Sequence, residues 1–316
     1  MNKSSRCSVV LGHPISVNKL ITSCLALWFI TVGAAVFPAS ADEAPNRIRI
    51  EYVPPHTNNY QDLAQRLKAN HALEKMQQMF SSFRLPNDLN LVVKECGMAN
   101  AWYQRPTVTI CYEYVDDIQK GIPKGTHEGI SQTDAVLGQF IYVVAHEMGH
   151  ALFDALSVPL LGGPEEAADE FATYMKLSFG KQDARRLIHG AAYGYKEYLR
   201  NPKVTVPLRA FSDVHGSPMQ RFYDLLCIAY GADQETFGDF VEQKHGHVTE
   251  TTALLQGHLP EARARGCRVE FGELNFAFKN LIRPHMDEEL EKTVLQEGWL
   301  PDVLAKPDVP PPPTKE

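Results

Sequence analysis

The sequence lacks an excess of positive charge. Its 31 lysine and arginine residues are outnumbered by 38 aspartate and glutamate residues, which gives a formal net charge of −7 at pH 7. A nucleic-acid-binding surface is normally basic, so this balance argues against a nucleic-acid partner and indicates no other partner. The chain has 316 residues, 44% of them hydrophobic and 22% charged, which is ordinary for a globular protein and excludes a fibrous or disordered chain.

Long hydrophobic runs are also scarce. The one long run covers residues 20–37, behind three basic residues and before Ala39-Ser40-Ala41. A basic start, an apolar middle and an A-x-A end are typical of a secretory signal peptide, so we expect residues 1–41 to be one. The run approaches the roughly 18–20 residues that span a bilayer, so an uncleaved membrane anchor is the alternative. We expect an exported protein, periplasmic or secreted, with membrane contact only if this segment is retained.

The sequence contains no C-x-x-C pair, so metal binding by thiols is not expected. Two of the six cysteines lie in the expected signal peptide, and four remain. An even number of cysteines in an exported chain suggests disulfides, and four cysteines allow three pairings. We favour Cys96–Cys111 and Cys227–Cys267.

Internal repeats are absent as well, and one domain over residues 42–300 is the simplest interpretation. Residues rich in β-branched side chains predict strands over 47–53, 89–96 and 107–115, and a turn at Gln104-Arg105-Pro106 favours a hairpin. The proline-rich residues 301–316 cannot pack and are expected to form a solvated tail.

Helical spacing of hydrophobic residues dominates the rest of the chain. It predicts a helix over about 60–83, and a long helix that Ser131 or Thr133 caps and that ends near Leu156. Further helices are expected from about Glu165 and across residues 220–230 and 271–281. The predicted architecture is therefore a mostly helical domain with a small sheet.

Residues 143–172 read VVAHEMGHALFDALSVPLLGGPEEAADEFA and carry the main chemical signal. Residues four apart share one face of a helix, so His146 and His150 can bind a single metal ion. Glu147 can then reach a water molecule on that ion. A chance H-E-x-x-H with two surface histidines is the alternative, but the uncharged flanks and the acidic cluster downstream argue against it.

A catalytic zinc ion needs a third protein ligand and one open position. A second helix begins near Glu165, directly after a glycine turn that can fold it back on the first. Glu165 and Asp169 stand four apart, so one can bind metal while the other supports a ligating histidine. Glu166 is the alternative third ligand. It shares a helix face with Glu170, and we expect that face to be solvated. The helix dipole favours an acidic residue in the first turn, so Glu166 can stand there without binding metal. Helix phase therefore favours Glu165.

The pattern HEMGH followed by E-x-x-x-D resembles the gluzincin metallopeptidases, which include thermolysin and the membrane-embedded CAAX-processing peptidases. The resemblance implies that Glu147 is the general base and that one zinc ion per chain is the cofactor. It also implies that His146, His150 and Glu165 are the zinc ligands and that Asp169 orients one of the histidines.

Upstream, Asn100-Ala101-Trp102-Tyr103 resembles the N-A-aromatic segment on the gluzincin edge strand, which holds the substrate backbone. The resemblance implies a substrate-binding role for Asn100, Ala101 and Trp102. It also implies an α+β, zincin-like fold, with a small mixed sheet that includes an edge strand, the H-E-x-x-H helix, and a mostly helical C-terminal part. Taken alone, Asn100 would be a turn residue and the aromatic residues would be core or edge residues.

More closely, the chain resembles an uncharacterised family of bacterial proteins thought to be metallopeptidases. The shared segments lie between about residues 89 and 267 and include ECG, NAWY, TICYE, HEMGH, EEAADEFA and DVHGSPMQRFYDLLCIAYG. This resemblance does not indicate the substrate.

We therefore expect a zinc endopeptidase that hydrolyses amide bonds in a peptide or protein substrate. The oxyanion of such a reaction needs a further donor, and His215 in a loop before a helix is the first candidate, with Arg221 and Tyr223 behind it. An ordinary loop or capping histidine is the alternative for His215. An H-x-H pair at residues 245–247 could bind metal weakly. A catalytically silent, zinc-stabilised assembly factor of the cell envelope is the second functional hypothesis.

Overall fold

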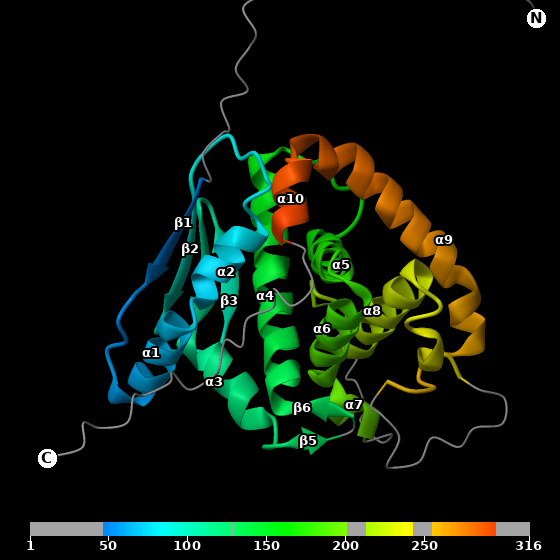
Figure 1. Cartoon of the computed structure of the whole chain (residues 1–316), viewed down its shortest axis with the longest axis horizontal. Helices are drawn as coiled ribbons and strands as arrows, with labels where there is room; N and C mark the ends of the chain where they lie inside the picture. The colour runs from blue at the N-terminus through cyan, green and yellow to red at the C-terminus, as the bar shows by residue number, and fades with distance from the viewer. Residues whose placement is uncertain (1–46, 128, 201–212, 243–254, 295–316) are drawn as a thin grey trace, which may run out of the picture. The chain divides into compact units, whose positions relative to one another are not determined.

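A four-stranded mixed sheet forms one side of the protein (Figure 1). Its strand order is β1 (Ile48–Tyr52), β2 (Leu89–Lys94), β4 (Thr107–Cys111) and β3 (Ala101–Gln104). The first three are parallel neighbours, and β3 runs antiparallel to β4 at the edge. The expected edge strand is therefore present.

The computed structural model describes residues 47–127, 129–200, 213–242 and 255–294. They all belong to one unit, Glu43–Glu316. The expected signal peptide, the proline-rich tail and the H-x-H pair at residues 245–247 lie outside the described residues.

Two predictions of secondary structure were wrong in part. Residues 107–115 were expected to form one strand, but the strand ends at Cys111 and helix α3 (Tyr112–Gly121) follows. Tyr112, Val115 and Ile118 are buried at a spacing of three, so helical packing outweighs the β propensity of this segment. The expected helix over 60–83 is broken at His71, whose positive φ of 54° separates two shorter helices.

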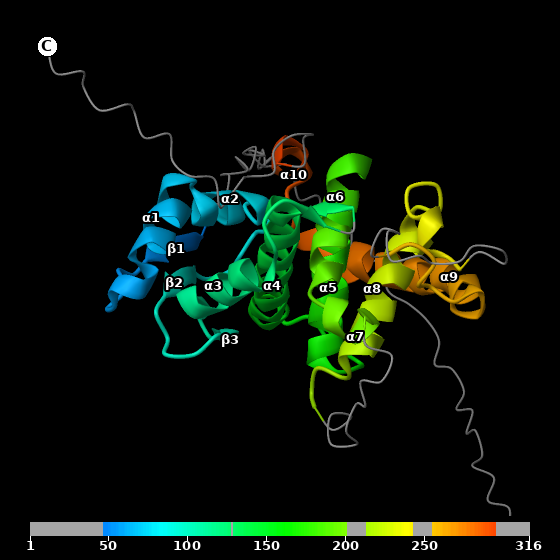
Figure 2. The ribbon, with the colours of Figure 1, turned by 90° about the horizontal axis from the view of Figure 1, so that it is seen from below.

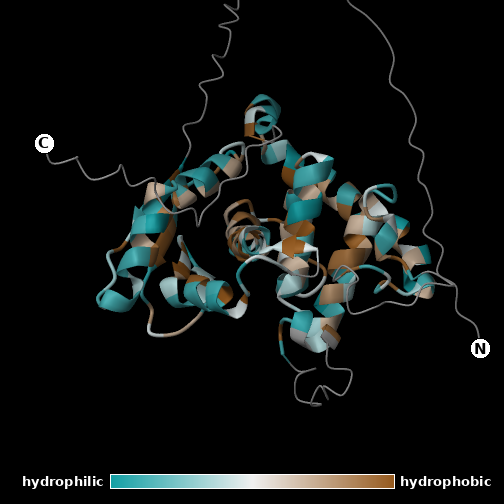
Figure 3. Cartoon of the chain, turned by 60° about the horizontal axis from the view of Figure 1, so that its bottom comes forward, coloured by the Kyte–Doolittle hydropathy of each residue, from teal (hydrophilic) through white to brown (hydrophobic). Residues whose placement is uncertain are grey.

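Helix α4 (Gln132–Ala155) is the central element, with 16 of its 24 residues buried. Its N-cap is Ser131, whose hydroxyl accepts a hydrogen bond from the Asp134 N–H, as expected for one of the two predicted caps. Figures 1 and 2 place α4 between the sheet on one side and helices α5 (Pro164–Leu177), α6 (Lys181–Tyr193) and α8 (Pro218–Ala232) on the other. In Figure 3 it is seen almost end-on and is mostly hydrophobic, whereas the outer helices carry many hydrophilic residues.

The other elements complete two hydrophobic clusters, one around the sheet and α4 and one around α6, α8 and α9. The α-helices are α1 (Gln61–Ala69), α2 (Ala72–Met79), α5 (Pro164–Leu177), α6 (Lys181–Tyr193), α7 (Lys196–Arg200), α8 (Pro218–Ala232), α9 (Glu261–Ala277) and α10 (Glu288–Val294). In the described ranges the short elements are β5 (Thr126–His127), β6 (Ile130–Ser131), three 3-10 turns (Asn58–Tyr60, Gly238–Phe240, Arg283–His285) and a π-helical turn (Phe278–Ile282). Among the described residues, no helix is long and apolar enough to cross a membrane.

Close helix contacts depend on glycine at particular positions. A Cβ atom at Gly138 of α4 would lie 2.5 Å from the Cα atom of Gly190 in α6. Gly149 stands between the two histidines of the motif in the sequence and faces α5. A Cβ atom there would lie 3.0 Å from Cδ1 of Phe171. These contacts hold α4 tightly against α5 and α6.

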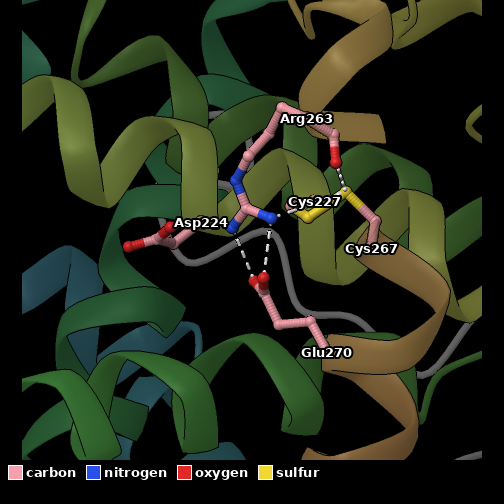
Figure 4. The surroundings of a disulfide bond; sticks show 5 residues. All are labelled: Asp224, Cys227, Arg263, Cys267 and Glu270. Atoms are coloured by element: carbon pink, nitrogen blue, oxygen red, sulfur yellow. Dashed lines mark hydrogen bonds and ion pairs between the residues drawn. A yellow bond between two sulfur atoms is a disulfide. The ribbon is translucent and has the colours of Figure 1, made fainter. Parts of the chain in front are cut away.

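Both expected disulfides are present. Cys96–Cys111 joins the segment after β2 to the end of β4, and Cys227–Cys267 joins α8 to α9. Figure 4 shows the second disulfide beside Arg263, which forms ion pairs with Asp224 and Glu270. The first disulfide anchors the chain immediately before β3, and the second holds the helix that carries Arg221.

Candidate metal centre

Three side chains from α4 and α5 meet at one point. The Nε2 atoms of His146 and His150 lie 3.2 Å apart. Glu165, in the first turn of α5, places Oε2 at 3.1 Å from His146 Nε2 and 3.2 Å from His150 Nε2. The ligand atoms of this trio all lie within 4.8 Å of one another, so the trio could hold a metal ion.

Glu166 lies apart from this point. It is exposed, and its carboxylate is folded back toward Gly163 at the start of the helix. In the described part of the chain one other group has suitable spacing, Cys96, Cys111 and Glu113, but its two sulfur atoms are bonded to each other. The arrangement of acidic residues is thus the one that helix phase predicted for Glu165 and Glu166.

The donor atoms fit a bound cation. Because the Nδ1–H of His146 donates to Asp169, a neutral imidazole carries its lone pair on Nε2, which faces the Glu165 carboxylate at 3.1 Å. Two lone pairs at this distance repel each other unless a proton or a cation lies between them. Burial and the neighbouring His146 lower the pKa of His150, which favours the neutral form that metals require.

Asp169 is held by four hydrogen bonds. It accepts from Nδ1 of His146 at 2.8 Å, from the hydroxyl of Tyr142 at 2.7 Å, and from Nε and Nη2 of Arg221 at 2.6 and 2.7 Å. Burial alone would raise the pKa of Asp169, but the hydrogen bonds from His146 and Arg221 outweigh it and hold the pKa far below its usual range. Asp169 is therefore a fixed anion that orients the His146 ring.

Tyr142 and the pairing of Arg221 with Asp169 were not predicted. Tyr142 stands one helical turn before His146, so helix geometry already places the two residues on the same face of the helix. Arg221 is 52 residues from Asp169, and nothing in the local pattern connects them. The interpretation of Glu170 as a solvated residue was wrong. It is half-buried under α8 and α9, and burial together with Glu270, Asp224 and Glu166 raises its pKa to about 7.

Glu147 is buried beside the trio, 7% exposed. Burial raises the pKa of its carboxyl, the neighbouring His146 lowers it, and Glu165 raises it again, with a net upward shift. A backbone hydrogen bond from Tyr103 of the edge strand also reaches this carboxylate. A carboxylate with a raised pKa is a stronger base than an exposed glutamate.

His215 faces the same centre from the loop before α8. Its Nε2 lies 3.1 Å from Oε2 of Glu165, and its Nδ1 lies 3.0 Å from Oδ1 of Asp213. Gly216, with a φ of 71°, and the cap at Ser217 turn the chain into the helix directly after it. Of the two other donor candidates, Arg221 binds Asp169, and Tyr223 packs against Phe222.

The edge strand passes along the opposite side of the centre. Cys111 N–H donates to the Asn100 carbonyl, and this register turns the backbone groups of Ala101 and Tyr103 away from β4. Asn100 and Ala101 line a cavity of about 310 Å³, which His146, Glu147 and His215 also line. Trp102 is half-buried, and the Lys94 ammonium lies 5.5 Å from the centroid of its ring.

Comparison with known proteins identifies one family. The sequence model of the DUF4344 family, described as "Putative metallopeptidase", matches residues 52–282, which is more than half of the chain and includes every candidate residue named above. No curated protein and no solved structure matches the chain.

Proposed function

The chain belongs to the DUF4344 family, and we propose that it is a zinc-dependent peptidase of the gluzincin type, which hydrolyses amide bonds in peptides or proteins. The observation that carries this proposal is the convergence of His146, His150 and Glu165 on one point next to a buried Glu147.

His146, His150 and Glu165 would hold the zinc ion. Two imidazoles and one carboxylate are a common ligand set for catalytic zinc, which keeps a further position open. When bound there, zinc would lower the pKa of a water molecule and polarise the substrate carbonyl. Asp169 fixes the His146 ring so that Nε2 points at the centre.

Glu147 acts as the general base. It takes a proton from the attacking water as the new C–O bond forms, and it gives a proton to the leaving nitrogen as the C–N bond breaks. Its raised pKa suits both steps, because the same carboxyl must gain and then lose a proton near neutral pH. The Tyr103 N–H holds the carboxylate toward the edge strand, where the substrate is expected.

His215 supplies a proton donor to the oxygen that gains negative charge. Its Nδ1 is paired with Asp213, which orients the ring so that Nε2 is directed at the centre. Removing a single donor of this kind typically lowers kcat by about 100- to 1000-fold.

The free edge of β3 binds the substrate backbone. The N–H and C=O groups of Ala101 and the C=O group of Tyr103 face away from β4 there, and an extended peptide can add to a sheet edge as a further strand. Disulfides persist in oxidising compartments. The two disulfides of this chain thus support an exported location, periplasmic or secreted.

A metal-removal experiment tests the proposal. The purified protein is incubated with a library of fluorogenic peptides before and after chelation, and then after addition of one equivalent of Zn²⁺. We expect cleavage to disappear on chelation and to return with zinc, and we expect Glu166→Gln, a change on the exposed neighbour of Glu165, to behave like the wild type. A zinc-loaded protein that cleaves no peptide would instead support a silent assembly factor.

A further inference from the structure

The cavity beside the candidate metal centre has walls that the proposed mechanism does not use. On the side away from Glu165 these walls are Tyr114 of α3, Gln139 and Tyr142 of α4, and Gly194 and Tyr195 directly after α6. None of these five residues carries a charge, and the four that have side chains carry hydrogen-bonding groups.

Three groups in this lining have unused hydrogen-bonding capacity. Within the described residues, the hydroxyl of Tyr114 and the Oε1 atom of Gln139 have no hydrogen-bond partner, because Gln139 uses only Nε2, toward the Ala135 carbonyl at 3.1 Å. Nε and Nη2 of Arg221 donate to Asp169, and Nη1 makes no hydrogen bond to any described residue. A ligand that fills the cavity buries these three groups, and a buried polar group without a partner is unfavourable, so they favour a polar ligand.

The remaining wall groups are fixed in place. Tyr142 donates to Asp169, and Tyr195 is hydrogen-bonded to Tyr142. A Cβ atom at residue 194 would lie 3.2 Å from Oε1 of Gln139, so Gly194 keeps the space beside that oxygen open. Burial raises the pKa values of Tyr114, Tyr142 and Tyr195, so their hydroxyls are neutral at physiological pH.

The direction of the edge strand indicates which part of a substrate reaches this cavity. Strand β3 runs in the same sense as α4, because Ala101 lines the cavity near Glu147 whereas Tyr103 donates to Asp154 near the end of α4. A peptide that pairs antiparallel to β3 runs in the opposite sense. Its residues after the cleaved bond then lie at the Asn100 end of the strand, where the cavity opens.

We propose that this cavity binds the side chain of the residue that follows the cleaved bond, and that it selects a carboxamide, as in glutamine or asparagine. This inference rests on the proposed peptidase function. A carboxamide has a carbonyl that accepts from Arg221 Nη1 and an NH₂ that donates to Gln139 Oε1, while the Tyr114 hydroxyl can pair with either.

Other side chains fit these groups less well. An apolar side chain leaves all three groups without partners. A carboxylate sets two acceptor oxygens against Gln139 Oε1 and near the Glu147 carboxylate, and an ammonium group faces the Arg221 guanidinium. The neutral side chain with both a donor and an acceptor is the one that satisfies the set.

A series of quenched fluorescent peptides tests this assignment in the zinc-loaded protein. The cleaved bond is first located by mass spectrometry of library products, and the following residue is then varied among glutamine, methionine, glutamate and lysine. Methionine is the matched control because it has nearly the shape of glutamine without its amide. We expect kcat/KM for the glutamine peptide to exceed that for the methionine peptide by about tenfold or more.

Two variants connect this preference to the cavity. Tyr114→Phe removes only the unpaired hydroxyl and should lower the glutamine-to-methionine ratio about three- to tenfold. Tyr198→Phe makes the same chemical change on the exposed surface of α7 and should leave the ratio at its wild-type value. Zinc content and circular dichroism establish that both variants are folded.

The outcomes separate the two proposals. Equal or faster cleavage of the methionine peptide, or a ratio that Tyr114→Phe leaves unchanged, would overturn the carboxamide assignment while the peptidase function stands. Failure of the zinc-loaded protein to cleave any peptide would overturn both.

Discussion

Replacing Asp169 with asparagine should damage two properties at once. The carboxylate accepts two hydrogen bonds from Arg221 and one from the Nδ1–H of His146. Asparagine has nearly the same shape, but it carries no charge, and its NH₂ group meets the donors of the guanidinium. Asp169→Asn therefore leaves Arg221 without an anionic partner and weakens the support of the His146 ring.

The loss of stability follows from the burial of the pair. The side chains of Asp169 and Arg221 are 15% and 24% exposed. Removing one partner of a fully buried ion pair costs about 3–5 kcal/mol, and the residual exposure reduces this to about 2–4 kcal/mol here. Urea unfolding of the metal-free protein measures this difference without any contribution from zinc.

Zinc affinity should fall separately. Loss of an acidic partner behind a ligating histidine typically weakens metal binding about 10- to 100-fold, which a chelator competition assay resolves. The double variant Asp169→Asn with Arg221→Met removes the unpaired guanidinium as well. It should regain part of the stability and none of the zinc affinity, because Arg221 does not contact His146. Wild-type stability and zinc affinity in Asp169→Asn would refute this account of Asp169.

Two further predictions concern the acidic residues of α5. Glu165→Ala should lower zinc occupancy far more than Glu166→Ala, measured by metal analysis after dialysis, and the reverse order would transfer the ligand role to Glu166. The pKa of Glu170 rises from a usual value of 4.5 to about 7 in the folded protein. Between pH 4.5 and pH 7, Glu170 is therefore protonated in the folded protein and ionised in the unfolded chain. Stability therefore decreases as pH rises from about 4.5 to 7, and Glu170→Gln should add about 1–2 kcal/mol to the unfolding free energy at pH 8 and little at pH 4.5. An equal gain at both pH values would contradict the burial of this carboxyl.

Local periodicity accounts for what the sequence predicted well. The spacing of His146 and His150 and the phase of Glu165 against Glu166 depend only on helix geometry, and the structure has the same arrangement. Ser131, one of the two expected caps, is likewise a short-range feature. The resemblance to gluzincins, and not local periodicity, implied the edge strand after Asn100.

Tertiary contacts account for the errors and omissions. Glu170 becomes half-buried because α8 and α9 cover its face of α5, and the carboxylates that raise its pKa come from residues 224 and 270 as well as its own helix. The pairing of Arg221 with Asp169 depends on the same packing. The segment after Cys111 forms a helix because Tyr112 and Val115 pack into the core, which propensity alone does not reveal.

The central claim is that Glu147 is the base of a zinc-dependent hydrolysis and not a structural residue. The variant Glu147→Gln keeps the size of the side chain and removes its basicity, so the most direct measurement is its zinc content together with its rate of peptide cleavage. We predict wild-type zinc content and a cleavage rate reduced at least about 100-fold. Turnover equal to that of the wild type would contradict the account.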